Sequence, residues 1–156
     1  DIGAGTGYMS LRLADRVPNG TVWAEDVQPE MVEILRDRMS SSGIDNVRPV
    51  QGDERSPGLE AQSIDLALMV DVYHELLYPR EMLDAVSQAL KPGGKIVLAE
   101  YKAENPRVMI KPLHKMSQSQ VRAELEAAGF QFRRNIKGLP QQHLMLFEKS
   151  NQETEI

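Results

Sequence analysis

Short apolar segments alternate with stretches of helical periodicity along this 156-residue chain. Strands are predicted for six apolar segments, at residues 21–24, 47–52, 64–70, 95–101, 130–136 and 143–149. Between them, apolar residues recur at the three- and four-residue spacing of helices that bury one face. Strands that alternate with helices in this way form a parallel sheet covered by helices, so the pattern predicts an α/β fold.

The helical stretches have predicted ends as well as predicted buried faces. The expected apolar stripes are Met9, Leu13 and Val17 for the first helix, Met31, Ile34, Leu35 and Met39 for the second, Met82, Leu83, Val86 and Leu90 for the third, and Val121, Leu125 and Ala128 for the fourth. Pro29 suits a first helical turn, and residues 41–43 and 91–94 are expected to end helices. Ser117 and Gln120 have the spacing of a capping box.

Three of the predicted strands carry further information. Pro49 predicts an edge position for 47–52, because proline cannot donate a hydrogen bond to a neighbouring strand. The nearly continuous apolar run 64–70 predicts a strand that is buried on both faces. The short polar link at 137–140 allows 130–136 and 143–149 to pair only as antiparallel neighbours.

The first seven residues, Asp1 to Gly7, place glycines at positions 3, 5 and 7 directly before a helix. Glycines allow a tight turn and let a ligand lie against the main chain, and the helix start adds unpaired N–H groups. A dinucleotide loop would read G-x-G-x-x-G, but Tyr8 follows the third glycine, which comes one residue early. No lysine follows the glycines, so the segment is not a P-loop.

This segment resembles the first motif of the class I S-adenosylmethionine (SAM)-dependent methyltransferases, D/E-x-G-x-G-x-G. The order of predicted elements is also similar to that family over nearly the whole chain. The resemblance implies a Rossmann-like, doubly wound sheet with strand order 3-2-1-4-5-7-6, strand seven antiparallel and helices on both faces. It implies one domain over residues 1–149, followed by a polar tail at 150–156. The first strand is expected to be cut short at Asp1, with upstream sequence missing.

Acids after the second strand are candidates for holding the cofactor ribose. Asp26 lies about 20 residues beyond the glycines, where an acid can accept both ribose hydroxyls in related folds. Glu25 competes for this role, although strand alternation is expected to point the two side chains in opposite directions. The family pattern favours Asp26, with the apolar Val27 beside it also in the cofactor site.

The resemblance assigns further cofactor contacts. Asp53 resembles the acid that accepts from the adenine amino group, with Glu54 as a substitute and Gly52 giving room for the ring. Asp1 and the carbonyl of Val70 resemble the groups that contact the methionine ammonium.

Within the glycine segment, roles differ by position. Gly3 and Gly5 are expected to be the points of close cofactor approach, with Ala4 and Thr6 framing them. Gly7 is expected to allow helix packing against the sheet. Tyr8 either flanks the methionine moiety or belongs to the core.

The segment Asp71–Leu76 resembles the aromatic-His segment of small-molecule methyltransferases. Methyl transfer from a sulfonium is an in-line displacement, so the protein mainly positions the acceptor. An oxygen acceptor also needs a base or a metal. His74 is the candidate general base, with packing or capping as the alternative, and Tyr73 and Glu75 are weaker candidates.

Other polar residues are given weaker roles. Asp71, His74 and Glu75 lie within five residues on a strand–helix junction and make a poor metal site, so no metal is expected. His114, within the predicted loop 102–116, could line the substrate pocket or belong to an exposed basic loop. His143 is expected to be structural.

Composition narrows the partners. The net charge is −5 and the pI is near 5.2, which argues against a nucleic-acid substrate held by a broad basic face. No apolar run reaches the ~18 residues needed to span a bilayer. A small-molecule substrate, a cytoplasmic location and a possible homodimer are expected, while a signal upstream of Asp1 stays open.

Two alternatives to a SAM-dependent methyltransferase stay open. An NAD(P)-dependent oxidoreductase is disfavoured by Tyr8 and by the terminal hairpin. A SAM-binding module without turnover is favoured by the lack of an unambiguous catalytic group.

Overall fold

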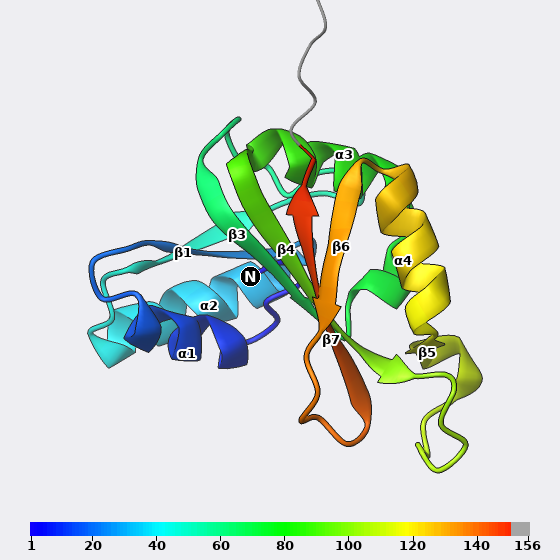
Figure 1. Cartoon of the computed structure of the whole chain (residues 1–156). Helices are drawn as coiled ribbons and strands as arrows, with labels where there is room; N and C mark the ends of the chain where they lie inside the picture. The colour runs from blue at the N-terminus through cyan, green and yellow to red at the C-terminus, as the bar shows by residue number, and fades with distance from the viewer. Residues whose placement is uncertain (151–156) are drawn as a thin grey trace, which may run out of the picture. The chain divides into compact units, whose positions relative to one another are not determined.

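The computed structural model describes residues 1–150, which form two compact units, Asp1–Gly58 and the part from Leu59 onward (Figure 1). Of the predicted polar tail, only Ser150 lies within the described residues. Each unit contains a sheet with helices packed on it.

The first unit contains a parallel pair of strands. Its elements are α1 (Tyr8–Arg16), β1 (Val22–Asp26), α2 (Pro29–Ser42) and β2 (Val47–Gln51). β1 pairs with β2 in parallel, and Ile2 forms a parallel bridge with Glu25 on the other edge of β1. Within residues 1–150, β2 has no strand partner other than β1, so the edge position predicted from Pro49 is confirmed.

Both helices of the first unit pack on the same apolar cluster, to which the predicted Leu35 and Met39 contribute, while other predicted residues do not. The cluster contains Ala14, Val22, Ala24, Leu35, Met39 and Val47. In α1 the small residues Ser10 and Ala14 are buried, and Val17 lies beyond the helix end and is 40% exposed. In α2 the buried stripe is Val32, Leu35 and Met39, so the prediction for Ile34, which is 43% exposed, was wrong.

The second unit contains a mixed sheet. Its elements are β3 (Ile64–Val70), η1 (Tyr73–Glu75), α3 (Pro79–Ala89), β4 (Leu90–Lys102), η2 (Pro112–His114), β5 (Lys115–Met116), α4 (Gln118–Ala127), β6 (Phe130–Asn135) and β7 (Gln142–Lys149). The strand order is β3-β4-β7-β6, with β3 and β4 parallel and β7 antiparallel to both of its neighbours. The predicted antiparallel hairpin is confirmed, and Figure 1 shows β7 between β4 and β6.

Some details of the second unit differ from the predictions. β3 is not buried on both faces throughout, because Asp65 is exposed and Leu66 is 45% exposed. Leu90 begins β4 instead of ending the preceding helix. The register along β3 shifts between Ile64 and Leu66, where β4 contains Pro92 and a left-handed Gly93 with φ of 70°.

The start of α4 is capped in the predicted way on one side only. The Ser117 hydroxyl accepts a hydrogen bond from the Gln120 N–H at 3.1 Å. The Gln120 side chain donates to Glu124 instead of returning to Ser117. Half of the predicted capping box is therefore formed.

Candidate functional site

The glycine turn of the first unit depends on three left-handed residues. The φ angles are 68° at Gly3, 54° at Gly5 and 86° at Gly7, values that residues with a Cβ rarely adopt. The Ala4 N–H donates to the Glu25 carbonyl at 2.8 Å, which ties the turn to β1. A Cβ on Gly5 would meet open space, so the main chain here is accessible to a ligand.

Gly7 has a packing role. A Cβ on Gly7 would lie 2.7 Å from Leu35 Cδ2 of α2, so the missing side chain lets the start of α1 lie against α2. Gly7 was expected to let a helix pack against the sheet, but its close neighbour is the side chain of Leu35 on α2.

Two buried acids at the end of β1 accept hydrogen bonds from this turn. The Gly3 N–H donates to Glu25 Oε2 at 3.3 Å, and the Gly5 N–H donates to Asp26 Oδ2 at 2.9 Å. The Gln28 N–H donates to the other Asp26 oxygen at 2.9 Å. Both carboxylates therefore bind the turn, each through its own N–H group, although strand alternation was expected to point the two side chains in opposite directions.

Glu25 is only 3% exposed, and this burial raises the pKa of its carboxyl to about 7, against the opposing effect of the Gly3 N–H. Glu25 also explains Gly52, because a Cβ there would collide with Glu25 Oε1 and lie 2.8 Å from the Ser56 carbonyl oxygen. The direction that a Gly52 Cβ would take is thus filled by protein atoms, and the close approach of the adenine ring at Gly52 stays a prediction.

The remaining predicted cofactor residues of the first unit differ in exposure. Asp53 is exposed and its Oδ1 accepts from the N–H groups of Arg55 and Ser56, at 2.7 and 2.8 Å. Asp1 Oδ2 accepts from the Ser10 hydroxyl at 2.5 Å. Val27 is 45% exposed, and Glu54 is also exposed.

Tyr8 lies on the surface. Its side chain is 61% exposed, and the Arg12 guanidinium carbon lies 3.5 Å from the centre of the tyrosine ring. The alternative that placed Tyr8 in the core was therefore wrong.

In the second unit, the segment after β3 buries the Tyr73 side chain and places the His74 ring beside the buried Glu100. The Tyr73 hydroxyl donates to Glu124 at 2.8 Å, and its N–H donates to Glu100 Oε1 at 2.9 Å. Burial, together with Glu124, raises the pKa of Tyr73 well above its ordinary value, so the hydroxyl stays protonated. Val70, which ends β3, is half-buried.

His74 connects the buried Glu100 of β4 with His114 of η2. His74 Nδ1 lies 2.6 Å from Glu100 Oε2, and His74 Nε2 lies 3.1 Å from His114 Nδ1. The His74 side chain is 5% exposed and that of Glu100 is 0% exposed. A charged Glu100 places the proton of a neutral His74 on Nδ1, which leaves a lone pair on Nε2. This tautomer is assigned from the hydrogen-bond network.

Glu100 is itself held in place on both oxygens, by the Tyr73 N–H and by His74. Burial raises its pKa, and the hydrogen bond from His74 opposes that effect. The sequence offered a signal for Glu100, since it is an acid within the apolar strand segment 96–101.

A cavity of about 430 Å³ opens beside these groups, a size that suits a small molecule. Its lining residues are Asp71, His74, Glu75, Tyr101, Met109, Ile110, Lys111 and His114. Asp71 has a left-handed φ of 54°, and its carboxylate accepts from Gln142 Nε2 at 2.9 and 2.7 Å. Burial raises the pKa of Asp71, although the Gln142 hydrogen bond opposes this. His114 lines this cavity and its side chain is 45% exposed, so the prediction that it lines a substrate pocket stays a prediction.

His143 has a structural environment, as predicted. Its ring lies 2.8 Å from Asn135 Nδ2 and 2.8 Å from Glu104 Oε2, and it is 7% exposed.

The chain is similar in sequence to known methyltransferases. The profile of a family described as "Methyltransferase domain" matches residues 1–96. The ubiquinone/menaquinone biosynthesis C-methyltransferase UbiE of Bordetella parapertussis is 31% identical over 102 residues, covering 65% of this chain and 39% of UbiE. A probable cobalt-precorrin-6B C(15)-methyltransferase (decarboxylating) of Methanothermobacter thermautotrophicus is 34% identical over 99 residues, covering 63% of this chain and 49% of the relative. The chain thus spans less than half the length of these two curated relatives.

Among solved structures, a SAM-dependent methyltransferase from Aquifex aeolicus superposes with a TM-score of 0.90 and 26% identity, covering 96% of this chain and 80% of that one. The predicted Rossmann-like fold class is confirmed by this likeness. None of the helices within residues 1–150 has the length and apolar character needed to cross a bilayer.

Proposed function

The chain belongs to the family of SAM-dependent methyltransferases, and from this premise we propose that it transfers the methyl group of SAM to a small-molecule acceptor. The names of two relatives support this class of acceptor, since one is a C-methyltransferase named for ubiquinone and menaquinone biosynthesis and the other is named a probable cobalt-precorrin-6B C(15)-methyltransferase. Family membership also argues against the alternative of an NAD(P)-dependent oxidoreductase.

The first unit supplies the proposed cofactor site. The observation that carries it is the glycine turn, where Gly5 borders open space and its N–H is held by the buried Asp26. SAM has a ribose whose hydroxyls such a carboxylate can accept, and an adenosyl group that can lie against bare main chain. On binding, the ribose hydroxyls would take over part of the hydrogen bonding that Asp26 now gives to the turn.

The other cofactor contacts keep their predicted roles. The methionine end is assigned to Asp1 and Tyr8, and the adenosyl end to Val27, Asp53 and Glu54. Ala4 frames the close approach at Gly3 and Gly5. These assignments follow from the family motif, and Val70 keeps its predicted carbonyl contact to the ammonium.

The cavity of the second unit is the proposed acceptor site. His74 lines it and is held by Glu100 with a lone pair on Nε2, so it can take a proton from an acceptor hydroxyl. Tyr73 keeps its hydroxyl on Glu124 and its N–H on Glu100, which supports a positioning role for this residue.

Calorimetry with SAM and with its demethylated product, S-adenosylhomocysteine, tests the cofactor site. We expect both to bind, and we expect Asp26→Asn to weaken SAM binding by about 10- to 100-fold, as loss of a hydrogen bond to a charged group does. Asp37→Asn, at an exposed position on α2, is the matched control and is expected to bind normally. Absence of heat for both ligands with the folded chain would refute the proposal.

Transfer of radiolabelled methyl from SAM to a panel of small acceptors tests turnover. Product formation that is lost in His74→Asn supports the enzyme. Cofactor binding without transfer across the panel would instead favour the alternative of a binding module.

A further inference from the structure

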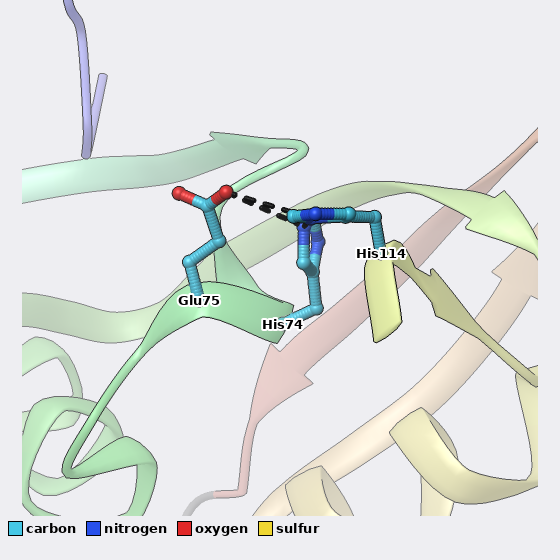
Figure 2. A group of neighbouring side chains, drawn as sticks. All are labelled: His74, Glu75 and His114. Carbon is cyan, nitrogen blue, oxygen red and sulfur yellow. Dashed lines mark hydrogen bonds and ion pairs between the residues drawn. The ribbon is translucent and has the colours of Figure 1, made fainter. Parts of the chain in front are cut away.

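Three side chains at one end of the second-unit cavity point toward one another (Figure 2). His74 and Glu75 come from η1, and His114 comes from η2. His74 Nε2 lies 3.1 Å from His114 Nδ1, and Glu75 Oε1 lies 3.7 Å from each of these nitrogens. Within residues 1–150 this is the group of histidine and acidic side chains whose possible ligand atoms gather this closely.

The spacing of the three atoms fits a metal ion. A point equidistant from atoms separated by 3.1, 3.7 and 3.7 Å lies about 2.0 Å from each of them. Zinc binds imidazole nitrogen at roughly 2.0–2.1 Å and carboxylate oxygen at roughly 2.0–2.2 Å. The side chains would therefore need little movement to bind such an ion. The His114 Nδ1 proton that now lies between the two imidazoles would leave, moving to His114 Nε2 or to solvent as the ion binds.

The surrounding hydrogen bonds prepare His74 as a ligand. A ligating histidine usually donates its other ring N–H to a carboxylate, which fixes the tautomer and makes the free nitrogen a better donor to the metal. Glu100 accepts from His74 Nδ1 at 2.6 Å and is fully buried. The lone pair of His74 Nε2 therefore faces His114 and Glu75, where the ion would lie.

We propose that His74 Nε2, His114 Nδ1 and the Glu75 carboxylate form a binding site for a divalent transition-metal ion of the zinc class. Two imidazoles favour such an ion over magnesium or calcium, which prefer oxygen ligands. Three protein ligands leave a coordination position open, as in catalytic zinc sites. All three residues line the cavity, so the open position can accept an oxygen atom of a bound small molecule.

This proposal departs from the expectation that no metal is bound here. The set considered from the sequence was Asp71, His74 and Glu75, but Asp71 is held by Gln142. His114, 40 residues beyond His74, takes its place. With the ion bound, His74 Nε2 is a ligand and is not free to act as the base. The ion would then polarise an acceptor oxygen, a consequence that rests on the proposed function.

Titration of chelator-treated protein with Zn²⁺, followed by calorimetry, and with Co²⁺, followed by visible absorption, tests the site. We expect one ion per chain and a Co²⁺ spectrum typical of nitrogen and oxygen ligands. His114→Ala and Glu75→Gln are expected to weaken binding by about 100-fold or more, above the roughly 10- to 100-fold cost of losing a residue that only orients a ligand.

Two matched controls retain the cluster. His143→Gln removes the histidine that lies outside it, and Glu60→Gln removes an exposed acid elsewhere in the second unit. Both are expected to bind the ion normally. Equal affinity in His114→Ala and the unaltered chain, or an equal loss in His143→Gln, would overturn the site.

Glu100→Gln tests the positioning role. Folding is checked by circular dichroism, and we expect ion binding about 10- to 100-fold weaker with a changed Co²⁺ spectrum. SAM calorimetry on the His114 and Glu75 variants separates this inference from the proposed function, because the glycine turn belongs to the first unit. Zinc binding without SAM binding would leave the metal site standing and refute the methyltransferase proposal alone.

Discussion

Glu25 is a buried acid whose protonation couples the glycine turn to pH. Its pKa in the folded chain, about 7, is above the ordinary value of 4.5. Folding therefore favours the protonated carboxyl, and the resulting stabilisation is complete below about pH 4.5 and is lost as the pH rises through about 7.

We expect Glu25→Gln, which keeps the shape of the protonated acid, to remove this loss. Between about pH 5 and pH 8 the unfolding free energy of the unaltered chain should fall relative to the variant by roughly 3 kcal/mol. Urea unfolding at a series of pH values measures the difference. Parallel pH profiles for the two proteins would contradict the raised pKa.

At this scale the sequence predicted single residues better than partnerships. Asp26 was a candidate from its distance to the glycines and from the family pattern, and the structure places its carboxylate on the Gly5 N–H. The contact between His74 and His114 could not be predicted in this way. It depends on how the segment 102–116 folds back, and that segment has no helical or strand periodicity that fixes its path.

Gly7 shows how one missing side chain shapes an element. It caps α1 with a φ of 86°, and a Cβ there would lie 2.7 Å from Leu35 Cδ2. Gly43 ends α2 with a φ of 68°, but a Cβ there would have nothing within 4 Å. A side chain at Gly43 would therefore cost only the strain of the left-handed backbone conformation.

We expect Gly7→Ala to lower the unfolding free energy by about 2–4 kcal/mol, through backbone strain and overpacking together. Gly43→Ala should cost about 1–2 kcal/mol, from the left-handed backbone only. Urea unfolding of both variants makes the comparison. Similar losses for the two would show that Leu35 moves aside freely.

Elements were predicted more accurately than their buried faces. The bounds of α2 agree with the prediction, but its stripe contains Val32 where Ile34 was expected. Both choices combine with Leu35 and Met39 at helical spacing, so periodicity alone does not distinguish them. The position of β1 and β2 against α2 decides which of these residues is buried, and the sequence of one helix does not reveal that position.

At the scale of the molecule, the strand neighbours within each unit follow the predicted order. β1 lies between β2 and Ile2, and β7 lies between β4 and β6. Alternating pattern and the family resemblance together predicted this order. The register shift between Ile64 and Leu66 was not predictable, because it depends on pairing between segments about 26 residues apart.

Ligand binding should act on the two units differently. We expect SAM to slow amide hydrogen exchange at residues 3–7 and 22–28, because the proposed site ties the glycine turn to the end of β1. Added Zn²⁺ should instead slow exchange around residues 73–75 and 112–115. Hydrogen-exchange mass spectrometry with each ligand alone measures both patterns, and protection by SAM that excludes the glycine turn would contradict the assignment.

The place of β7 inside the sheet affects how the second unit is made during synthesis. β4 is complete at Lys102, but the strand that covers its other edge begins only at Gln142. Until the ribosome has released that strand, the nascent chain presents an unpaired apolar edge, which can pair with other chains. That interval is therefore when pairing between nascent chains competes most directly with folding of the second unit.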